Sequence, residues 1–376
     1  MRLAFFVSSV GDTDLAKATI SKLLEQSSDS IFIIPLTTTA VDRTKDLKDN
    51  KMISVVSIEE ILKQPGLLAK DQLSEQEAEI VKLFLEDKRI QHAYFGVPSN
   101  NNEMPYQIAN QLTIPFTIAY EYMFKPEKHS LWKHVGVLAA KDNCHFAVPL
   151  DSAVMDIKEL NNKANVHVIG HLSLDRMQGD ASDNTKIHKL LSIDAEKELI
   201  FVSGTTQPTE VDNQFLKALL AELATGKYPS IQLRMGIHPG VKDLDVYLQT
   251  LLKTCDMFQT VKDQFKIVLT SQLASKLKQP IDNSPFVIRA DVSGADAAQT
   301  ANNITQAVPG ALLNEAALRG KPSYFHDQAT KPYLPKTWFS ESISAFFTAK
   351  PQLPHSKDEL GLNDSAPNLL SKVIMR

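Results

Sequence analysis

The sequence lacks the features that mark several special classes of protein. Only two cysteines, Cys144 and Cys255, occur among 376 residues, which argues against a disulfide framework and for a reducing compartment. No apolar run approaches the roughly 20 residues that span a bilayer. The first apolar run, residues 3–10, predicts a buried strand rather than a signal peptide. We therefore expect a cytoplasmic protein with no transmembrane segment, for which only peripheral membrane contact stays open.

A strong charge of either sign is also missing. The chain carries 40 basic and 44 acidic residues, a net charge of −4, and no block of Lys and Arg breaks the mixing. Proteins that bind nucleic acid need clustered basic residues against the phosphates. The composition therefore predicts no nucleic-acid partner. At 376 residues, the chain exceeds the size at which single cores usually split, so we expect two domains.

Short apolar runs alternate with segments of helical period along most of the chain. This alternation predicts parallel strands with crossover helices, an α/β fold. Residues 135–140 and 145–149 are predicted as two further strands. A polar stretch interrupts the alternation, which restarts near Leu199. We predict two Rossmann-like parallel-sheet domains that face a cleft; the boundaries are an N-terminal acceptor domain over residues 1–173, a linker region over 174–198, a C-terminal donor domain over 199–348, and a loosely packed tail over 349–376.

The most informative stretch is a loop and helix near the end of the second half. Pro309, Gly310 and Ala311 open a segment of helical period that carries Asn314 and Glu315. Glycine permits close approach of a ligand to the backbone, and a helix start offers free N–H groups and partial positive charge to a diphosphate. A carboxylate one turn into the helix suits ribose hydroxyls. The spacing also fits an ordinary helix that ends at a glycine.

The stretch resembles the donor-binding segment of the GT-B superfamily, which includes many glycosyltransferases and the non-hydrolysing UDP-N-acetylglucosamine 2-epimerases. In that superfamily a Gly-containing turn meets the phosphates, and a Glu at the start of the next helix binds the ribose. Pro309, Gly310 and Ala311 match the turn and Glu315 matches the Glu, while residues 320–322 match the end of the segment. Residues 166–175 are similar to the V-x-G-x-x-x-x-D strand that ends the first domain. The resemblance implies a GT-B fold with a nucleotide-sugar donor.

A second cluster follows a predicted strand of the second half. Arg234, His238 and Lys242 form a candidate cationic pocket for a diphosphate leaving group, and the pair His238-Pro239 resembles one found at this place in several GT-B enzymes. The alternative is an ordinary turn after the strand, in which the imidazole of His238 forms its hydrogen bonds with neighbouring groups of the protein. Gly204 and Thr205 follow another strand, where they suit either phosphate binding or a capped turn.

The first half is expected to hold the acceptor. Asp12 follows the first strand and is either a helix cap or a general base. Glu121 lies between Tyr120 and Tyr122, where a partly buried carboxylate can act as a base. It matches in place an acidic residue of the epimerase segment E-A-G. A solvated loop glutamate is the other interpretation of Glu121.

Two GT-B chemistries fit the chain, and missing residues separate them. The epimerases carry H-G-D after the fourth strand, where this chain has Phe95, Gly96 and Val97. They carry H-R-R where this chain has Ser203, Gly204 and Thr205. We therefore predict a glycosyltransferase of the hexosyltransferase class. It moves a sugar from a nucleotide-sugar donor to an unidentified glycan, lipid or protein. The alternatives are a nucleotide-sugar 2-epimerase and a GT-B module that binds without catalysis.

Neither a metal nor a cofactor is expected in this enzyme. No D-x-D ends a predicted strand, and no His, Cys and Asp cluster has metal-ligand spacing, so the donor diphosphate is expected to be held by cations and a helix dipole. The stereochemical expectation also comes from the resemblance. Retaining GT-B enzymes often have two Glu eight residues apart near the donor, and Ala307 stands where the first would be. Inversion of the anomeric centre is therefore favoured.

Overall fold

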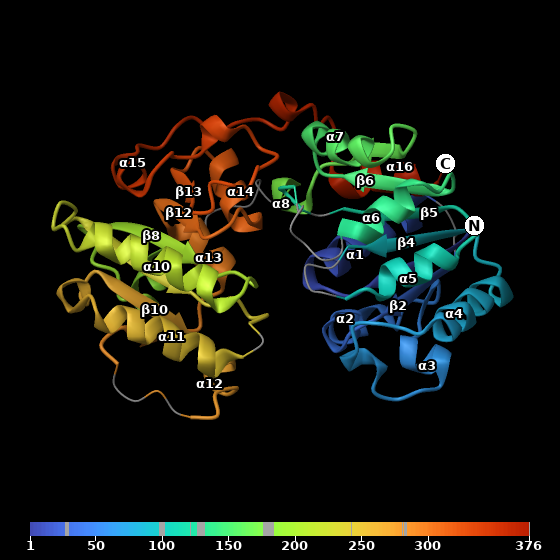
Figure 1. The fold of residues 1–376 in the computed structure, drawn as a ribbon, viewed down its shortest axis with the longest axis horizontal. Coiled ribbons are helices and arrows are strands. Elements are labelled where there is room, and N and C mark those ends of the chain that lie inside the picture. Colours follow the sequence, from blue (N-terminus) through green and yellow to red (C-terminus); the bar gives the residue numbers. More distant parts are fainter. Residues whose placement is uncertain are drawn as a thin grey trace. The chain divides into compact units, whose positions relative to one another are not determined.

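The computed structural model describes residues 1–26, 30–97, 102–120, 122–125, 132–175, 184–241, 243–279, 281 and 284–375. The chain forms two compact units (Figure 1). Unit 1 comprises Met1–Asp175 and Lys357–Arg376, and unit 2 comprises Arg176–Ser356. Each is built on one parallel sheet with interleaved helices, as the alternation in the sequence predicts.

The sheet of unit 1 has seven strands in the order β3-β2-β1-β4-β5-β6-β7. The strands are β1 (Arg2–Val7), β2 (Ser30–Pro35), β3 (Ile53–Val55), β4 (His92–Gly96), β5 (Phe116–Ala119), β6 (Cys144–Val148) and β7 (Asn165–Val168). The helices are α1 (Val10–Gln26), α2 (Thr38–Arg43), α3 (Ile58–Leu62), α4 (Glu75–Asp87), α5 (Met104–Gln111), α6 (Trp132–Ala139), α7 (Asp151–Leu160), α8 (Leu172–Asp175) and α16 (Ala366–Ile374).

Strand β1 is apolar on both faces because both faces are covered. Leu3, Phe5 and Val7 belong to a core that β1 shares with α1 and α16. On the opposite face Phe6 stacks on Phe95 of β4, with ring centroids 4.6 Å apart. Helices α4, α5, α6 and α7 pack one beside the next. Continuous apolar runs of this kind are typical of parallel sheets buried between two helical layers.

The sheet of unit 2 has six strands in the order β11-β10-β9-β8-β12-β13. The strands are β8 (Glu198–Ser203), β9 (Ile231–Gly236), β10 (Phe265–Leu269), β11 (Val287–Arg289), β12 (Asn303–Gln306) and β13 (Ser323–Phe325). The helices are α9 (Asn184–Leu190), α10 (Thr209–Leu223), α11 (Leu244–Asp256), α12 (Ser271–Ala274), α13 (Gly294–Thr300), α14 (Ala311–Leu318) and α15 (Ile343–Thr348).

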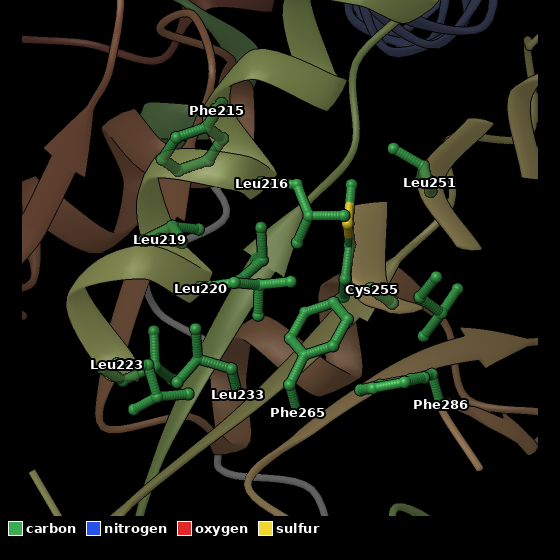
Figure 2. Close-up of a cluster of buried hydrophobic side chains, with 14 of the residues drawn as sticks. Phe215, Leu216, Leu219, Leu220, Leu223, Leu233, Leu251, Cys255, Phe265 and Phe286 are labelled. Carbon is green, nitrogen blue, oxygen red and sulfur yellow. The ribbon is translucent and has the colours of Figure 1, made fainter. Parts of the chain in front are cut away.

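The core of unit 2 lies where α10 and α11 pack on the sheet (Figure 2). Its labelled members, each at most 1% exposed, are Phe215, Leu216, Leu219, Leu220, Leu223, Leu233, Leu251, Cys255, Phe265 and Phe286. Full burial of one Leu or Phe side chain contributes about 1.5–3 kcal/mol, so this cluster is a main source of stability. Burial raises the pKa of the Cys255 thiol to about 12, and the thiol therefore packs as a neutral group.

The C-terminal segment is not the loose tail that the sequence predicts. Residues 357–376 return to unit 1, where α16 packs on α1 and buries Leu370 and Ile374. Asp175 fixes this return. One of its carboxylate oxygens accepts the N–H of Ala366 at 2.8 Å, and the other pairs with Lys357. The sequence pattern does not indicate α16, because the segment before it is polar and contains proline. The helix is also short, and it packs on residues that are distant in the sequence.

Two further expectations about local structure are wrong. Residues 135–139 of the expected strand 135–140 belong to helix α6 rather than to a strand. Val135, Leu138 and Ala139 are its buried residues, and six consecutive residues are too few for periodicity to separate a strand from a helix. Within the expected linker region, α9 is helical and packs on α13 of unit 2.

We expect Leu370→Ala to destabilise unit 1, because truncation of a fully buried leucine costs about 2–5 kcal/mol. Leu353, which is 87% exposed, supplies the matched control, and Leu353→Ala is expected to change the free energy of unfolding by less than about 0.5 kcal/mol. Urea denaturation measures both variants. Equal stability of the two would contradict the place of α16 in the core.

Candidate functional site

The strand order of unit 2 reverses between β8 and β12. From β8 the chain adds β9, β10 and β11 on one side, and it then places β12 and β13 on the other. In parallel α/β sheets ligands bind at such a switch point, outside the carboxyl ends of the strands. The loops after β8 and β12 carry Gly204, Thr205, Pro309 and Gly310. Adjacent strands thus bring together the two loops that the sequence singles out.

Helix α14 begins at this edge without a capping side chain. Its N-cap residue is Gly310, which has no side chain that could accept a hydrogen bond from the first turn. Other helices of unit 2 have side-chain caps, from Thr270, Ser293 and Ser342. Pro309 is buried and Ala311 is exposed. The free N–H groups and partial positive charge of the helix start suit an anion.

A buried amide lies against this helix start. Gln306 ends β12 at 6% exposed, and a Cβ at position 310 would lie 2.7 Å from Gln306 Oε1. Glycine at 310 therefore leaves room for that amide. Asn314 donates its Nδ2 to Gly310 O at 2.9 Å. Gln306 Oε1 and Asn314 Oδ1 are buried and accept no hydrogen bond from the residues that the structure describes. Buried acceptors without donors are costly, so both are suited to an N–H or O–H group of a ligand or water.

Glu315 is held by its own helix. Its Oε1 lies 2.9 Å from Arg319 Nη2, an i to i+4 ion pair, and the two side chains are 19% and 20% exposed. A carboxylate that precedes its cation by one turn has the favourable orientation for such a pair. The pair orients Glu315 one turn from the N-terminus of α14, the place that the sequence predicts for the ribose-binding residue.

The segment that follows α14 is structural. Gly320 has φ of +73°, and a Cβ there would lie 2.3 Å from Gln352 O. Lys321 donates to the carbonyls of Ala298, Gln299 and Ala301 at 3.1, 2.6 and 2.6 Å. Burial lowers the pKa of Lys321 to about 8. This lysine therefore caps the C-terminal end of α13.

The loop after β8 is held by a buried carboxylate. Thr205 donates its N–H and its hydroxyl to Asp212, both at 2.9 Å, and Tyr247 donates its hydroxyl to the same carboxylate at 2.7 Å. A Cβ on Gly204 would lie 2.8 Å from Gly236 O, so glycine is required for packing against β9. Of the two interpretations of Thr205, the capped turn is therefore the one that fits. The hydroxyl proton of Thr205 is bonded to Asp212 and is not available to a phosphate.

Arg234 lies away from the expected diphosphate pocket. It is 1% exposed, and its five N–H groups donate to Leu191 O, Leu233 O, Gln264 O, Ser192 O and Gln232 Oε1. Burial lowers its pKa to about 10, so the guanidinium stays charged near pH 7. The structure corrects the sequence-based assignment: Arg234 anchors the connection between α9 and β8 to the sheet.

His238 stands at the switch-point edge. Its side chain is exposed on one side, and its Nδ1 accepts the N–H of Gly240 at 3.0 Å. The protein atoms around the rest of the ring lower the pKa of His238, while Asp212 opposes the shift. The imidazole is therefore neutral near pH 7, with Nε2–H as its donor. Lys242, the third member of the expected cluster, lies outside the described residues.

Unit 1 has its own switch point, between β1 and β4, and Asp12 fills it. The Asp12 carboxylate is fully buried and accepts the N–H groups of Ser8 and Ser9 at 3.0 and 2.7 Å and the hydroxyl of Ser8 at 2.9 Å. A Cβ on Gly96 would lie 2.2 Å from the Cβ of Asp12. Burial raises the pKa of Asp12, against these hydrogen bonds. Asp12 therefore fastens the β1–α1 turn, which favours the structural interpretation over that of a base.

Glu121, the other candidate base, lies outside the described residues, as do residues 98–101 of the polar loop after β4. Its neighbours are described. Tyr120 is 2% exposed, and its ring centroid lies 5.4 Å from that of Tyr122 and 6.1 Å from that of Trp132. An aromatic cluster thus lines the carboxyl end of β5.

Sequence reasoning missed several residues that shape these edges. Gln306 ends the short, mostly polar strand β12, and nothing in its spacing indicates its position beside Gly310. Arg319 follows Glu315 by four residues, a spacing that could have indicated the ion pair. Asp212 lies in the first turn of a predicted helix, but its partner Tyr247 comes from another helix.

Two absences hold for the part of the chain that the structure describes. No group of three or more His, Cys, Asp or Glu residues there is placed to hold a metal ion. None of the helices there is long and apolar enough to cross a membrane.

Comparison with known proteins shows a shared fold. No protein-family model matches the sequence, and no curated protein matches it. Among solved structures, the UDP-N-acetylglucosamine 2-epimerase from Rickettsia bellii is similar with a TM-score of 0.62 at 13% identity, over 100% of this chain and 95% of that one. The UDP-GlcNAc 2-epimerase from Neisseria meningitidis, bound to UDP-GlcNAc, has a TM-score of 0.59 at 12% identity over 100% of both chains.

A transferase is also similar. The glycosyltransferase from Rickettsia africae ESF-5 has a TM-score of 0.53 at 14% identity, over 86% of this chain and 78% of that one. The chain therefore has the GT-B fold, with two Rossmann-like α/β domains, as the sequence predicts. Identities this low show the fold alone.

We expect Arg234→Lys to lower the free energy of unfolding by roughly 2–4 kcal/mol, because lysine cannot supply five donors in a plane. Arg289→Lys is the matched control, since Arg289 is exposed on β11, and its stability is expected to stay within about 0.5 kcal/mol of the wild type. Thermal and urea unfolding provide the measurement. A variant at position 234 as stable as the control would contradict the anchoring role.

Proposed function

We propose that the protein is a metal-independent glycosyltransferase that moves a sugar from a nucleoside-diphosphate sugar to an acceptor hydroxyl. One observation carries the proposal. An uncapped helix start, that of α14, lies at the switch point of unit 2 and is followed one turn later by an oriented carboxylate, Glu315. A nucleoside diphosphate requires an anion site for its phosphates and, beside it, a group that accepts hydrogen bonds from the ribose hydroxyls.

The diphosphate is the group that this helix start would hold. Its first-turn N–H groups supply donors, and its dipole contributes about 0.3–1 kcal/mol toward a bound anion, up to ~2 in partly buried geometries. His238 Nε2–H, on the loop after β9 and beside the loop after β8, is proposed as a further donor. The leaving diphosphate gains negative charge as its bond to the sugar breaks. Donors fixed in advance stabilise this developing charge without reorganisation.

Glu315 is the proposed ribose ligand. A carboxylate accepts from two neighbouring hydroxyls, and Arg319 restrains its rotation at 2.9 Å. Hydrogen bonds to a charged acceptor contribute about 1.5–3 kcal/mol when they are formed in a partly buried site. Loss of that acceptor should therefore weaken nucleotide binding more than loss of a surface carboxylate does.

Nucleotide-sugar 2-epimerisation is the second candidate. The similarity to 2-epimerase structures over the full length of both chains favours it. Gly96 and Val97 at the end of β4, and Ser203, Gly204 and Thr205 at the end of β8, favour transfer instead, because the acidic and basic residues expected of the epimerases are missing there. A module that binds the nucleotide sugar without catalysis is the remaining alternative.

We expect Glu315→Gln to weaken binding of UDP about tenfold, which corresponds to 1.4 kcal/mol. Isothermal titration calorimetry measures the dissociation constant, with Glu341→Gln as the control, since Glu341 is exposed. UDP is the probe because UDP-GlcNAc is the ligand named with a matched structure. Equal affinity of the two variants would remove Glu315 from the site, and failure of the wild type to bind would overturn the donor site.

The products distinguish the three functions. Incubation with UDP-N-acetylglucosamine followed by chromatography is expected to yield free UDP, with water as a slow acceptor. A 2-epimeric UDP-sugar would establish epimerisation in its place. Binding of UDP with neither product would establish the non-catalytic module.

A further inference from the structure

Two buried side-chain amides lie at the start of α14. Gln306, at the end of β12, is 6% exposed, and Asn314, one turn into the helix, is 0% exposed. Gln306 Oε1 and Asn314 Oδ1 accept no hydrogen bond from the residues that the structure describes. Folded proteins rarely leave buried acceptors unpaired, because each then costs its full desolvation penalty. The two amides are therefore suited to a partner that binds from outside the chain.

The orientation of the Asn314 amide shows what kind of partner its oxygen requires. Asn314 Nδ2 donates to Gly310 O at 2.9 Å. A carbonyl oxygen can only accept, so this contact identifies which end of the amide is the nitrogen and which is the oxygen. Asn314 Oδ1 therefore needs a group that carries a proton. An ionised diphosphate offers only acceptor oxygens, so the anion expected at this helix start cannot pair with Asn314 Oδ1.

The Gln306 amide reaches the same point of the helix. A Cβ at position 310 would lie 2.7 Å from its Oε1 and 3.1 Å from its Nε2. Ser203, which pairs with Gln306 in the ladder between β8 and β12, donates its hydroxyl to Gly204 O at 3.4 Å. Rotation about the last side-chain bond exchanges the oxygen and nitrogen of a glutamine amide. A hydroxyl group satisfies either orientation, because it both donates and accepts.

The two amides adjoin the anion site of the proposed donor. They lie against Gly310, the N-cap residue of α14, and β12 borders the switch point of unit 2. Glu315 is the proposed ligand of the ribose, on one side of the diphosphate. The group joined to the other side of the diphosphate in a nucleotide sugar is the sugar itself. Its hydroxyls supply the donors that Gln306 and Asn314 lack.

We propose that Gln306 and Asn314 are specificity-determining residues that bind the sugar hydroxyls of the donor, and that they make the site select a nucleotide sugar over a nucleotide without a sugar. The assignment rests on the proposed function, because it needs a nucleotide at the start of α14. A ligand without these hydroxyls leaves both amides unpaired. Sites built to bind a hydroxyl reject analogues that lack it for this reason.

The test compares two ligands of equal charge. UDP-N-acetylglucosamine carries sugar hydroxyls beyond the diphosphate, whereas the methyl ester of UDP carries a methyl group there. Isothermal titration calorimetry with the full chain measures both dissociation constants. We expect the wild type to bind the sugar nucleotide at least about tenfold more tightly, since two hydrogen bonds to buried groups are gained.

Three variants of unit 2 test whether the two amides cause this preference. Gln306→Met and Asn314→Leu each remove one amide at similar side-chain volume, and we expect each to reduce the ratio of the two dissociation constants to about threefold. Gly310→Ala displaces the Gln306 amide by its Cβ and should act like Gln306→Met. Alanine tolerates the φ of −132° at position 310. Gln76→Met, exposed on α4 of unit 1, is the matched control and should keep the wild-type ratio.

The outcomes separate this assignment from the donor site. Equal affinity of the wild type for the two ligands would overturn the role of both amides and leave the anion site intact. A wild-type ratio in the variants that still bind the methyl ester would overturn it too, since a buried water or the packing alone would then serve the amides. A wild type that binds neither ligand would overturn the proposed function, and the specificity assignment with it.

Discussion

Burial of the sheets between helical layers is the constraint on which the rest of the structure depends. The strands use their backbone groups in the parallel ladder, and their side chains fill the two apolar layers. Polar chemistry is left to the carboxyl edge, where strands end and helices begin with unpaired N–H groups. Reversal of strand order, between β1 and β4 in unit 1 and between β8 and β12 in unit 2, separates neighbouring loops at that edge.

The fold itself uses many of the polar groups near these edges. Asp12 and Asp212 each accept hydrogen bonds from the turn that follows the first strand of their unit. Arg234 donates all five of its N–H groups to carbonyl and amide oxygens of the protein. Polar groups that make no such hydrogen bonds within the fold are the ones suited to ligands. The start of α14 and the exposed side of His238 belong to this second class, and a residue type alone does not show to which class it belongs.

This distinction explains how much the sequence predicts. The alternation of strands and helices follows from local periodicity, so the two α/β units and the loop before α14 are evident from the sequence. Arg234 was misassigned because its partners, Leu191 and Gln264, come from distant segments. Residues 135–140 were misassigned because a six-residue apolar run carries no period. The position of Gln306 beside Gly310 was missed because such contacts arise only when separate elements pack.

The return of the chain to unit 1 has a consequence for biosynthesis. Unit 1 contains residues 1–175, which precede unit 2, yet its core includes α16, which follows unit 2. Unit 2 lies between the two parts, so a ribosome has finished all of unit 2 before the last helix of unit 1 emerges. Usually the N-terminal domain folds first during synthesis. Here unit 1 cannot complete its core until unit 2 has been synthesised. Unit 1 is the first to start and the last to be complete.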